Sequence, residues 1–183
     1  MPRTRSELER DAKVAEIVEA AERRLRKGGY EALSVAGLAR ELGLAQNAIY
    51  WYFPSKDHLF VAALQQMLSD IASRKPRHHE VGPIERILWF TDQFQALFHL
   101  RGAMSERAGD SPVVADFVEE LDALLSRMLS NALRDHVAAD ELPVAVETFR
   151  ATVEGTFVKG LAKRARHEVL TFALERLMRT DAR

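Results

Sequence analysis

The chain has 183 residues, of which 47% are apolar, and its formal net charge is −1. This length and composition predict one large or two small domains, and they argue against a disordered chain. A charge near zero argues against a protein that coats polyanions, and the absence of cysteine excludes disulfides and thiolate metal sites. No apolar run approaches the roughly 18 residues of a membrane span, and the first residues lack the apolar stretch of a signal peptide. We therefore expect a cytoplasmic protein.

Residues 1 to 11 are polar and mix arginines with acidic residues. We expect a flexible arm here, and the alternative is a basic arm that contacts phosphates or the minor groove. An amphipathic helix is predicted over about residues 12–27, and Gly28 and Gly29 should end it. We interpret the cations near its end as complements of the helix dipole in preference to DNA contacts. These cations are Arg23, Arg24, Arg26 and Lys27.

Residues 34 to 44 predict a short helix followed by a tight turn. Apolar residues recur there at i, i+3, i+4 and i+7, which places them on one helical face. Ser34 precedes them at the position where a hydroxyl caps the first turn, and Gly43 follows where a left-handed residue is least costly.

A second short helix is predicted from about Gln46 to Trp51, with only Ile49 placed to point inward. Its other side chains are small, amide-bearing or aromatic, and no carboxylate occurs between Glu41 and Asp57. We expect Trp51 to pack against the following helix. Two helices joined by a short glycine-containing turn, the second too polar to be core, are typical of a DNA-binding helix-turn-helix.

The rest of the chain predicts helices only. Ser55 should cap a helix that runs to about Ser73, with Asp57 in its first turn, and Pro and Gly interrupt the pattern over residues 74–83. Further helices are predicted over 83–100, 112–137, 143–166 and 167–179, with a break at 101–111. Gly155 and Gly160 then lie inside a helix, where a close helix approach would explain them. The predicted fold is all-α.

This pattern resembles the TetR (tetracycline-repressor-like) family of bacterial transcriptional regulators. The matching residues lie between 12 and 60: Val-Ala-Gly-Leu-Ala ending at Ala39, Leu42-Gly43-Leu44, Ala48-Ile49-Tyr50, Tyr52-Phe53, Ser55-Lys56-Asp57 and Leu59. The sequence departs from the family at Leu44-Ala45, where Val-Ser is frequent, and losing the serine removes a cap worth about 1 kcal/mol. The resemblance implies a helix-turn-helix domain over residues 1–60 and a helical effector-binding and dimerisation domain over 61–183.

The resemblance also implies the residues that contact DNA. Ser34, Tyr52 and Lys56 would contact phosphates, while the residues facing base edges would be Gln46, Asn47, Ala48 and Tyr50. The residue chemistry agrees, because Gln and Asn can pair bidentately with adenine. A phosphate contact would also explain Lys56, whose charge is unfavourable in the first turn of a helix. Arg40, on the polar face of the supporting helix, is a further phosphate candidate.

A palindromic operator and a homodimer follow from the same resemblance, because one unit of this kind buries little DNA surface. The interface would come from the last two helices, with Phe157, Leu161, Leu170, Leu174 and Leu177 as candidates. An effector pocket, apolar in character, would lie among the middle helices. Its candidates are Trp89, Phe90, Gln93, Phe94, Phe117, Leu121, Met128 and Phe149. The alternative for every interface and pocket candidate is that it packs in the core of its own chain. For the pocket candidates, we favour core packing over a pocket role.

Catalysis is not expected. None of the six histidines falls in an H-E-x-x-H or similar ligand-spaced motif, and neither a phosphate-binding glycine loop nor a nucleophile elbow is present. We expect no cofactor and no metal. The predicted function is that of a ligand-released repressor, and the alternative is a helical ligand-binding or protein-interaction module that no longer binds DNA.

Overall fold

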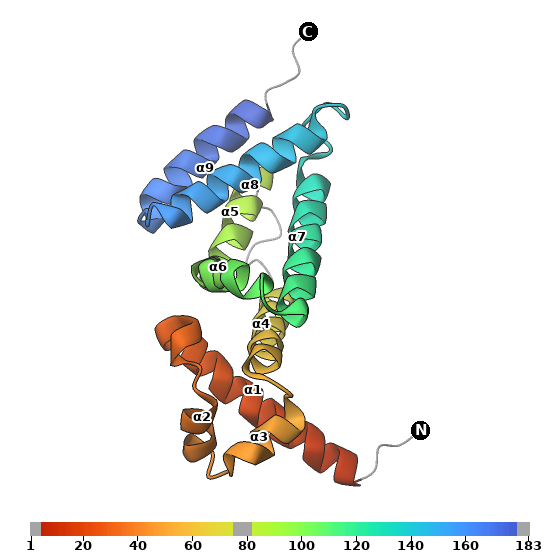
Figure 1. The fold of residues 1–183 in the computed structure, drawn as a ribbon. Coiled ribbons are helices and arrows are strands. Elements are labelled where there is room, and N and C mark those ends of the chain that lie inside the picture. The colour runs from red at the N-terminus through yellow and green to blue at the C-terminus, as the bar shows by residue number, and fades with distance from the viewer. Residues whose placement is uncertain (1–4, 75–81, 179–183) are drawn as a thin grey trace. The chain divides into compact units, whose positions relative to one another are not determined.

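The computed structural model describes residues 5–74 and 82–178. All regular elements in these residues are helices, which confirms the predicted all-α fold (Figure 1). Their bounds are α1 Arg5–Ala32, α2 Val35–Glu41, α3 Gln46–Tyr52, α4 Lys56–Ser73, α5 Pro83–Gln93, α6 Gln95–Ala108, α7 Pro112–Leu133, α8 Leu142–Val158 and α9 Lys163–Leu177.

The described residues form two compact units. The N-terminal unit comprises residues 5–74 and 100–118, and the C-terminal unit comprises residues 82–99 and 119–178. The chain passes between them within α6 and within α7, so each of these helices contributes residues to both units. The predicted division of the chain at residue 60 stays a prediction.

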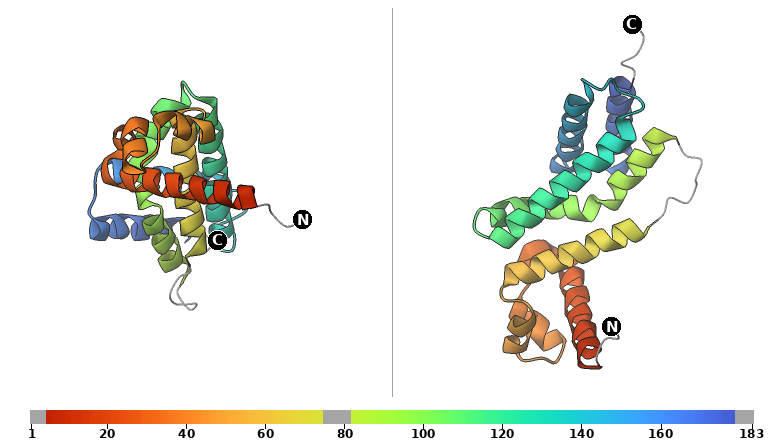
Figure 2. Two further views of the ribbon diagram at one scale, coloured as in Figure 1. Left: turned by 90° about the horizontal axis from the view of Figure 1, so that it is seen from below. Right: turned by 90° about the vertical axis from the view of Figure 1, so that its right-hand side faces the viewer.

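The helix α1 packs against α4 in the N-terminal unit (Figures 1 and 2). It begins at Arg5, so the flexible arm predicted for residues 1 to 11 is wrong for residues 5–11, and residues 1–4 lie outside the described residues. The predicted interruption is confirmed at Gly29, whose φ of 66° is left-handed.

The turn between α2 and α3 confirms the predicted caps. The Oγ of Ser34 accepts a hydrogen bond from the Gly37 N–H at 3.2 Å, which satisfies an orphan donor of α2. Gly43 has a φ of 64°, and the N–H of Leu44 donates to the Ala39 carbonyl at 2.9 Å. This Schellman arrangement ends α2 and directs the chain into α3. Ala45 provides no side-chain cap for α3, as its sequence implied.

The helices predicted for the C-terminal half are wrong in their extent. The helix predicted over 83–100 ends at Gln93, and a new helix, α6, runs through Gly102 to Ala108. The helix predicted over 143–166 ends at Val158, because Gly160 adopts a φ of 63° and the Leu161 N–H donates to the Thr156 carbonyl at 3.0 Å. Gly160 is therefore a turn residue, and α9 begins at Lys163. The helix α7 likewise ends earlier than predicted, at Leu133.

The core of the C-terminal unit joins α5, α7, α8 and α9. The last two helices lie side by side in Figures 1 and 2. Leu170 and Leu174 of α9 are fully buried in this core, together with Leu133, Phe149 and Val153. These two leucines therefore contribute to intramolecular packing, which corrects their prediction as interface residues.

Candidate nucleic-acid interface and apolar cavity

The outer face of α3 is exposed and carries no charge. Gln46, Asn47 and Tyr50 all reach solvent, while Ile49 is buried on the opposite side, as predicted. Trp51 is 88% exposed, so the prediction that it packs against the following helix is wrong. This face presents amides and two aromatic rings to any molecule that approaches it.

The other residues proposed for the interface flank this face with different degrees of burial. Ser34 and Arg40 are exposed on α2 and its cap, whereas Ala48, Tyr52 and Lys56 are half-buried. The Nζ of Lys56 lies 3.7 Å from the centroid of the Tyr30 ring. This cation–π contact gives the lysine a stabilising partner at a helix terminus whose dipole disfavours it.

The acidic group closest in sequence to α3 on its N-terminal side is paired. Glu41 accepts hydrogen bonds from Arg24 at 2.9 Å and from Arg23 at 3.2 Å, and these bonds hold the pKa of its carboxyl below the ordinary value. Arg24 also donates to the Gly37 carbonyl at 3.1 Å. Arg23 and Arg24 thus have structural partners at α2, whereas the interpretation of these cations as complements of the helix dipole stays a prediction.

A cluster that the sequence did not predict surrounds Asp57 in the N-terminal unit. This carboxylate is 8% exposed and accepts two hydrogen bonds from Arg107 of α6, at 2.8 and 3.2 Å. The hydroxyl of Tyr30 donates to the same carboxylate at 2.6 Å, and its ring packs edge-on against Phe60. A bidentate guanidinium is the strongest partner a carboxylate finds among side chains. The pair therefore fixes the first turn of α4 to α6.

The cluster shifts the titration of its acidic members. The hydrogen bonds from Arg107 lower the pKa of Asp57 to about 2, although burial opposes this shift. Burial and the bond to Asp57 raise the pKa of Tyr30 to about 12. At neutral pH, Asp57 is therefore charged and Tyr30 is a neutral donor.

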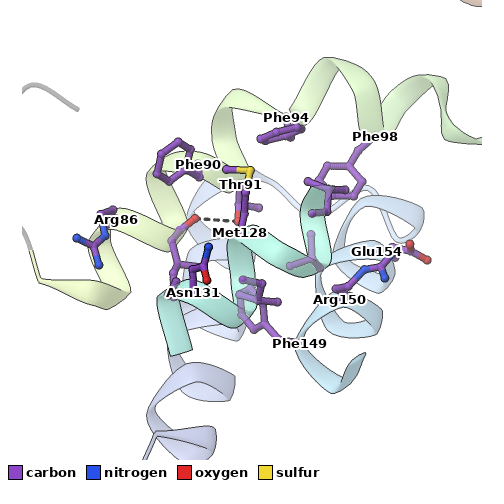
Figure 3. A pocket seen from close by; sticks show the side chains of 15 residues that line it. Arg86, Phe90, Thr91, Phe94, Phe98, Met128, Asn131, Phe149, Arg150 and Glu154 are labelled. Carbon is purple, nitrogen blue, oxygen red and sulfur yellow. Dashed lines mark hydrogen bonds between the residues drawn. The ribbon is translucent and has the colours of Figure 1, made fainter. Parts of the chain in front are cut away.

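A cavity of about 350 Å³ lies in the C-terminal unit between α5, α6, α7 and α8 (Figure 3). Its wall is mostly apolar and includes four phenylalanine rings. The lining residues are Arg86, Ile87, Phe90, Thr91, Phe94, Phe98, Leu125, Met128, Leu129, Asn131, Ala132, Phe149, Arg150, Val153 and Glu154.

Four of the eight predicted pocket residues line this cavity, namely Phe90, Phe94, Met128 and Phe149. The other four do not. Trp89 packs edge-on against Phe90 at a centroid distance of 4.9 Å but does not itself line the cavity, and neither does Gln93. Phe117 and Leu121 are buried in core packing. The sequence did not single out Arg86, Asn131 or Arg150, because polar residues on helices carry no pattern that distinguishes a cavity from solvent.

The helices α8 and α9 expose apolar side chains. Phe172 is 61% exposed and Val158 is 88% exposed, whereas the predicted interface residues Phe157, Leu161 and Leu177 are half-buried. Phe157 stacks on Phe98 at a centroid distance of 4.4 Å. Exposed apolar residues on two adjacent helices of one unit are typical of a protein–protein contact.

In residues 5–74 and 82–178, His, Asp and Glu side chains do not gather in any group of three that would hold a metal ion. Within the same ranges, every helix is too short or too polar to cross a bilayer.

Residues 17–63 match the family described as bacterial regulatory proteins, tetR family. The chain is also 30% identical over 125 residues to the HTH-type transcriptional repressor KstR of Rhodococcus jostii, covering 65% of this chain and 59% of that protein. Residues 17–63 therefore belong to the tetR family of bacterial regulatory proteins. The chain aligns with little more than half of the length of this KstR.

Solved structures of similar fold cover the C-terminal helices as well. A transcriptional regulator from Rhodococcus sp. Rha1 superposes with a TM-score of 0.76 at 18% identity, covering 90% of this chain and 95% of that one. A regulator from Saccharomonospora viridis, solved in complex with choline, has a TM-score of 0.71 at 15% identity over 90% and 96% of the two chains. At these identities the likeness shows the fold: an N-terminal helix-turn-helix and a C-terminal helical domain.

Proposed function

We propose that the protein is a DNA-binding transcriptional regulator, in particular a repressor, that acts in the cytoplasm as a homodimer on a palindromic operator. The observation that carries this proposal is the outer face of α3, with exposed Gln46, Asn47 and Tyr50 and no carboxylate. A module that no longer bound DNA would have no physical need for such a face. Repression is preferred because the KstR relative is named a repressor. The family is one of regulators, and the proposal includes no catalytic step.

The proposed DNA-binding residues make two kinds of contact. Gln46, Asn47, Ala48 and Tyr50 face base edges in the major groove, where amides read adenine. Ser34, Arg40, Tyr52 and Lys56 contact phosphates, which positions α3 without reading sequence. Lys56 is held over the Tyr30 ring, so its ammonium is already ordered before DNA binds.

Dimerisation supplies the second recognition helix. Two recognition helices must lie about 34–36 Å apart to enter successive major grooves. An interface at α8 and α9 is supported by the exposed apolar side chains of these helices, among them Val158 and Phe172. The half-buried residues Phe157, Leu161 and Leu177 would add apolar surface to it.

A small apolar effector in the C-terminal cavity is proposed to control DNA binding. The complex of a structural neighbour with choline supports a small-molecule effector in general, without indicating which one. The helix α6 carries Phe98, which lines the cavity, and Arg107, which binds Asp57 beside α3. An effector that prefers one placement of α6 would therefore change the setting of the recognition helix. Such control requires different affinities of the effector for the two states.

A gel-shift experiment on the DNA that flanks the protein's own gene tests the proposal. Lys56→Ala should weaken binding to all sequences alike and reduce the dependence of log affinity on log salt by about one, because one phosphate contact is lost. Gln46→Ala and Asn47→Ala should cost roughly 1–3 kcal/mol and relax the preference at particular bases.

The matched control is Arg127→Ala, which removes an exposed cation from α7 in the C-terminal unit and should leave operator binding unchanged. The proposal is wrong if the wild-type protein shows no specific shift, or if the α3 variants behave like this control.

A further inference from the structure

The polar residues of the C-terminal cavity are not equivalent. Thr91 is used internally, since its Oγ1 donates to the Ile87 carbonyl at 3.0 Å (Figure 3). Arg150 is neutralised, because it binds Asp122 at 2.8 Å and Glu147 at 3.2 Å and also donates to Ser126. Glu154 has an interaction of its own. Each of these three groups therefore already has a partner within the protein.

Arg86 differs from all of them. It is exposed, it lines the cavity from α5, and its guanidinium has no acidic partner among the described residues. Asn131, on α7, is also exposed and has no side-chain partner in that part of the chain. Figure 3 places Arg86 and Asn131 toward one end of the cavity and Arg150 and Glu154 toward the other. One uncompensated positive charge and one amide therefore mark a single end of an otherwise apolar space.

We propose that the cavity binds an amphipathic carboxylic acid, with its hydrocarbon body among the phenylalanine rings and its carboxylate on Arg86 and Asn131. This inference rests on the proposed effector role of the cavity and names its ligand class. A guanidinium matches a carboxylate through two parallel hydrogen bonds, and the Asn131 amide can donate a third. A neutral ligand would leave the charge of Arg86 unused, and a cationic one would be repelled by it.

The size and lining of the cavity favour a small acid. Its volume of about 350 Å³ is near the lower end of the range of small-molecule pockets, which is about 300–1,000 Å³. Phe90, Phe94 and Phe98 provide rigid walls, and Met128 provides a flexible one that adapts to a hydrocarbon chain. A single cation compensates one negative charge, so a carboxylate fits better than a doubly charged phosphate.

The experiment titrates the purified full chain with four probes that share one alkyl chain: decanoate, 1-decanol, decylamine and decyl phosphate. Trp89 serves as the fluorescent reporter, because it contacts Phe90 of the cavity wall. The chain has two tryptophans, so the titrations use a Trp51→Phe background in which Trp89 is the only one. Decanoate should bind at least tenfold more tightly than 1-decanol and decylamine, and more tightly than decyl phosphate.

Arg86→Gln tests whether the preference arises at this end of the cavity. It should weaken decanoate binding about tenfold and leave the affinity for 1-decanol unchanged. Arg127→Gln is the matched control, since it removes an exposed arginine from α7 that does not line the cavity, and it should leave both affinities unchanged. Unchanged melting temperatures of both variants would establish that they fold.

The remaining outcomes overturn the inference. Equal affinities for decanoate, 1-decanol and decylamine would show an apolar site without acid selectivity, and tighter binding of decylamine or decyl phosphate would assign a different class. No saturable binding of decanoate would exclude an acid of this size. An equal loss of decanoate affinity in both arginine variants would show that the net charge of the protein, and not a contact with Arg86, attracts the acid. The titrations contain no DNA, so a failed gel-shift with acid binding intact refutes the proposed function alone, and the reverse result refutes this inference alone.

Discussion

Asp57 in the N-terminal unit and Asp92 in the C-terminal unit are both held by cations, but the two aspartates have different surroundings. In the N-terminal unit, Asp57 binds one arginine, Arg107, whose side chain is 28% exposed, and a neutral tyrosine. In the C-terminal unit, Asp92 binds Lys163 at 2.7 Å, Arg166 at 3.1 Å and His167 at 3.0 Å. Asp57 thus has one cationic partner, which also binds Asp110 at 3.4 Å, whereas Asp92 is bound by two cations and a histidine.

The difference lies mainly in the burial of the two arginines. The side chain of Arg166 is 4% exposed and stacks over Phe157, with its Cζ 4.6 Å from the ring centroid. Water can reach Arg107 if its partner is lost, but it reaches Arg166 far less readily. Burial favours the protonated form of Asp92, yet the bonds from Lys163, His167 and Arg166 hold its pKa below the ordinary value. Asp92 is therefore the carboxylate that compensates the buried charge of Arg166.

Asp92→Asn should have the largest effect on stability. It leaves Arg166 buried without an acidic partner, and breaking a buried pair in this way costs about 3 kcal/mol of unfolding free energy. Urea unfolding at pH 7 and fixed protein concentration, followed by Trp89 fluorescence in the Trp51→Phe background, measures this loss in the C-terminal unit. The double variant Asp92→Asn/Arg166→Met should recover part of it. If Asp92→Asn lost less unfolding free energy than Asp57→Asn, the proposed greater importance of Asp92 would be wrong.

Asp57→Asn should cost less, about 2 kcal/mol at pH 7, as the lowering of its pKa from 3.8 to about 2 implies. Because the folded-state pKa is the lower one, the stabilisation is present above the unfolded value of 3.8 and is lost as the pH falls toward 2. Unfolding followed by circular dichroism at pH 7 and at about pH 3 measures the difference. The variant and the wild type should converge at low pH, and a gap that stayed constant would contradict this account.

The sequence predicted what depends on neighbouring residues and missed what depends on distant ones. The capped helix-turn-helix followed from Ser34 and Gly43, because both act within a few residues of their own position. Gly160 forms the same kind of turn as Gly43, but it stands inside a continuous apolar pattern, so the sequence predicted an unbroken helix there. The ion pairs of Asp57 and Asp92 join residues far apart in the chain and leave no periodic signal.

The candidate sites also contain parts that the sequence predicted from neighbouring residues and parts that depend on distant ones. The amides of α3 were predicted because a polar face on a short helix after a glycine turn is a local pattern. The cavity was predicted only through apolar residues, since Arg86 and Asn131 are ordinary surface residues until the fold sets them at one cavity end. Trp51 was expected to pack against the following helix, and its 88% exposure shows that hydrophobicity does not determine which face of a short helix is buried.

The smallest expected effect concerns the neutral partner of Asp57. The pKa of Tyr30 is raised to about 12, so its contribution to stability is present below the unfolded value of 10.0 and is lost as the pH rises toward 12. At about pH 11, phenolate absorbance should therefore count fewer ionised tyrosines in the folded protein than in urea. Tyr30→Phe should remove this difference while keeping the bond between Asp57 and Arg107. Asp57→Asn should lower the pKa of Tyr30, because the carboxylate both accepts its proton and repels a phenolate. If Tyr30 ionised equally in the wild type and in Asp57→Asn, burial alone would account for its shift, and the tyrosine would not belong to the charge balance that distinguishes Asp57 from Asp92.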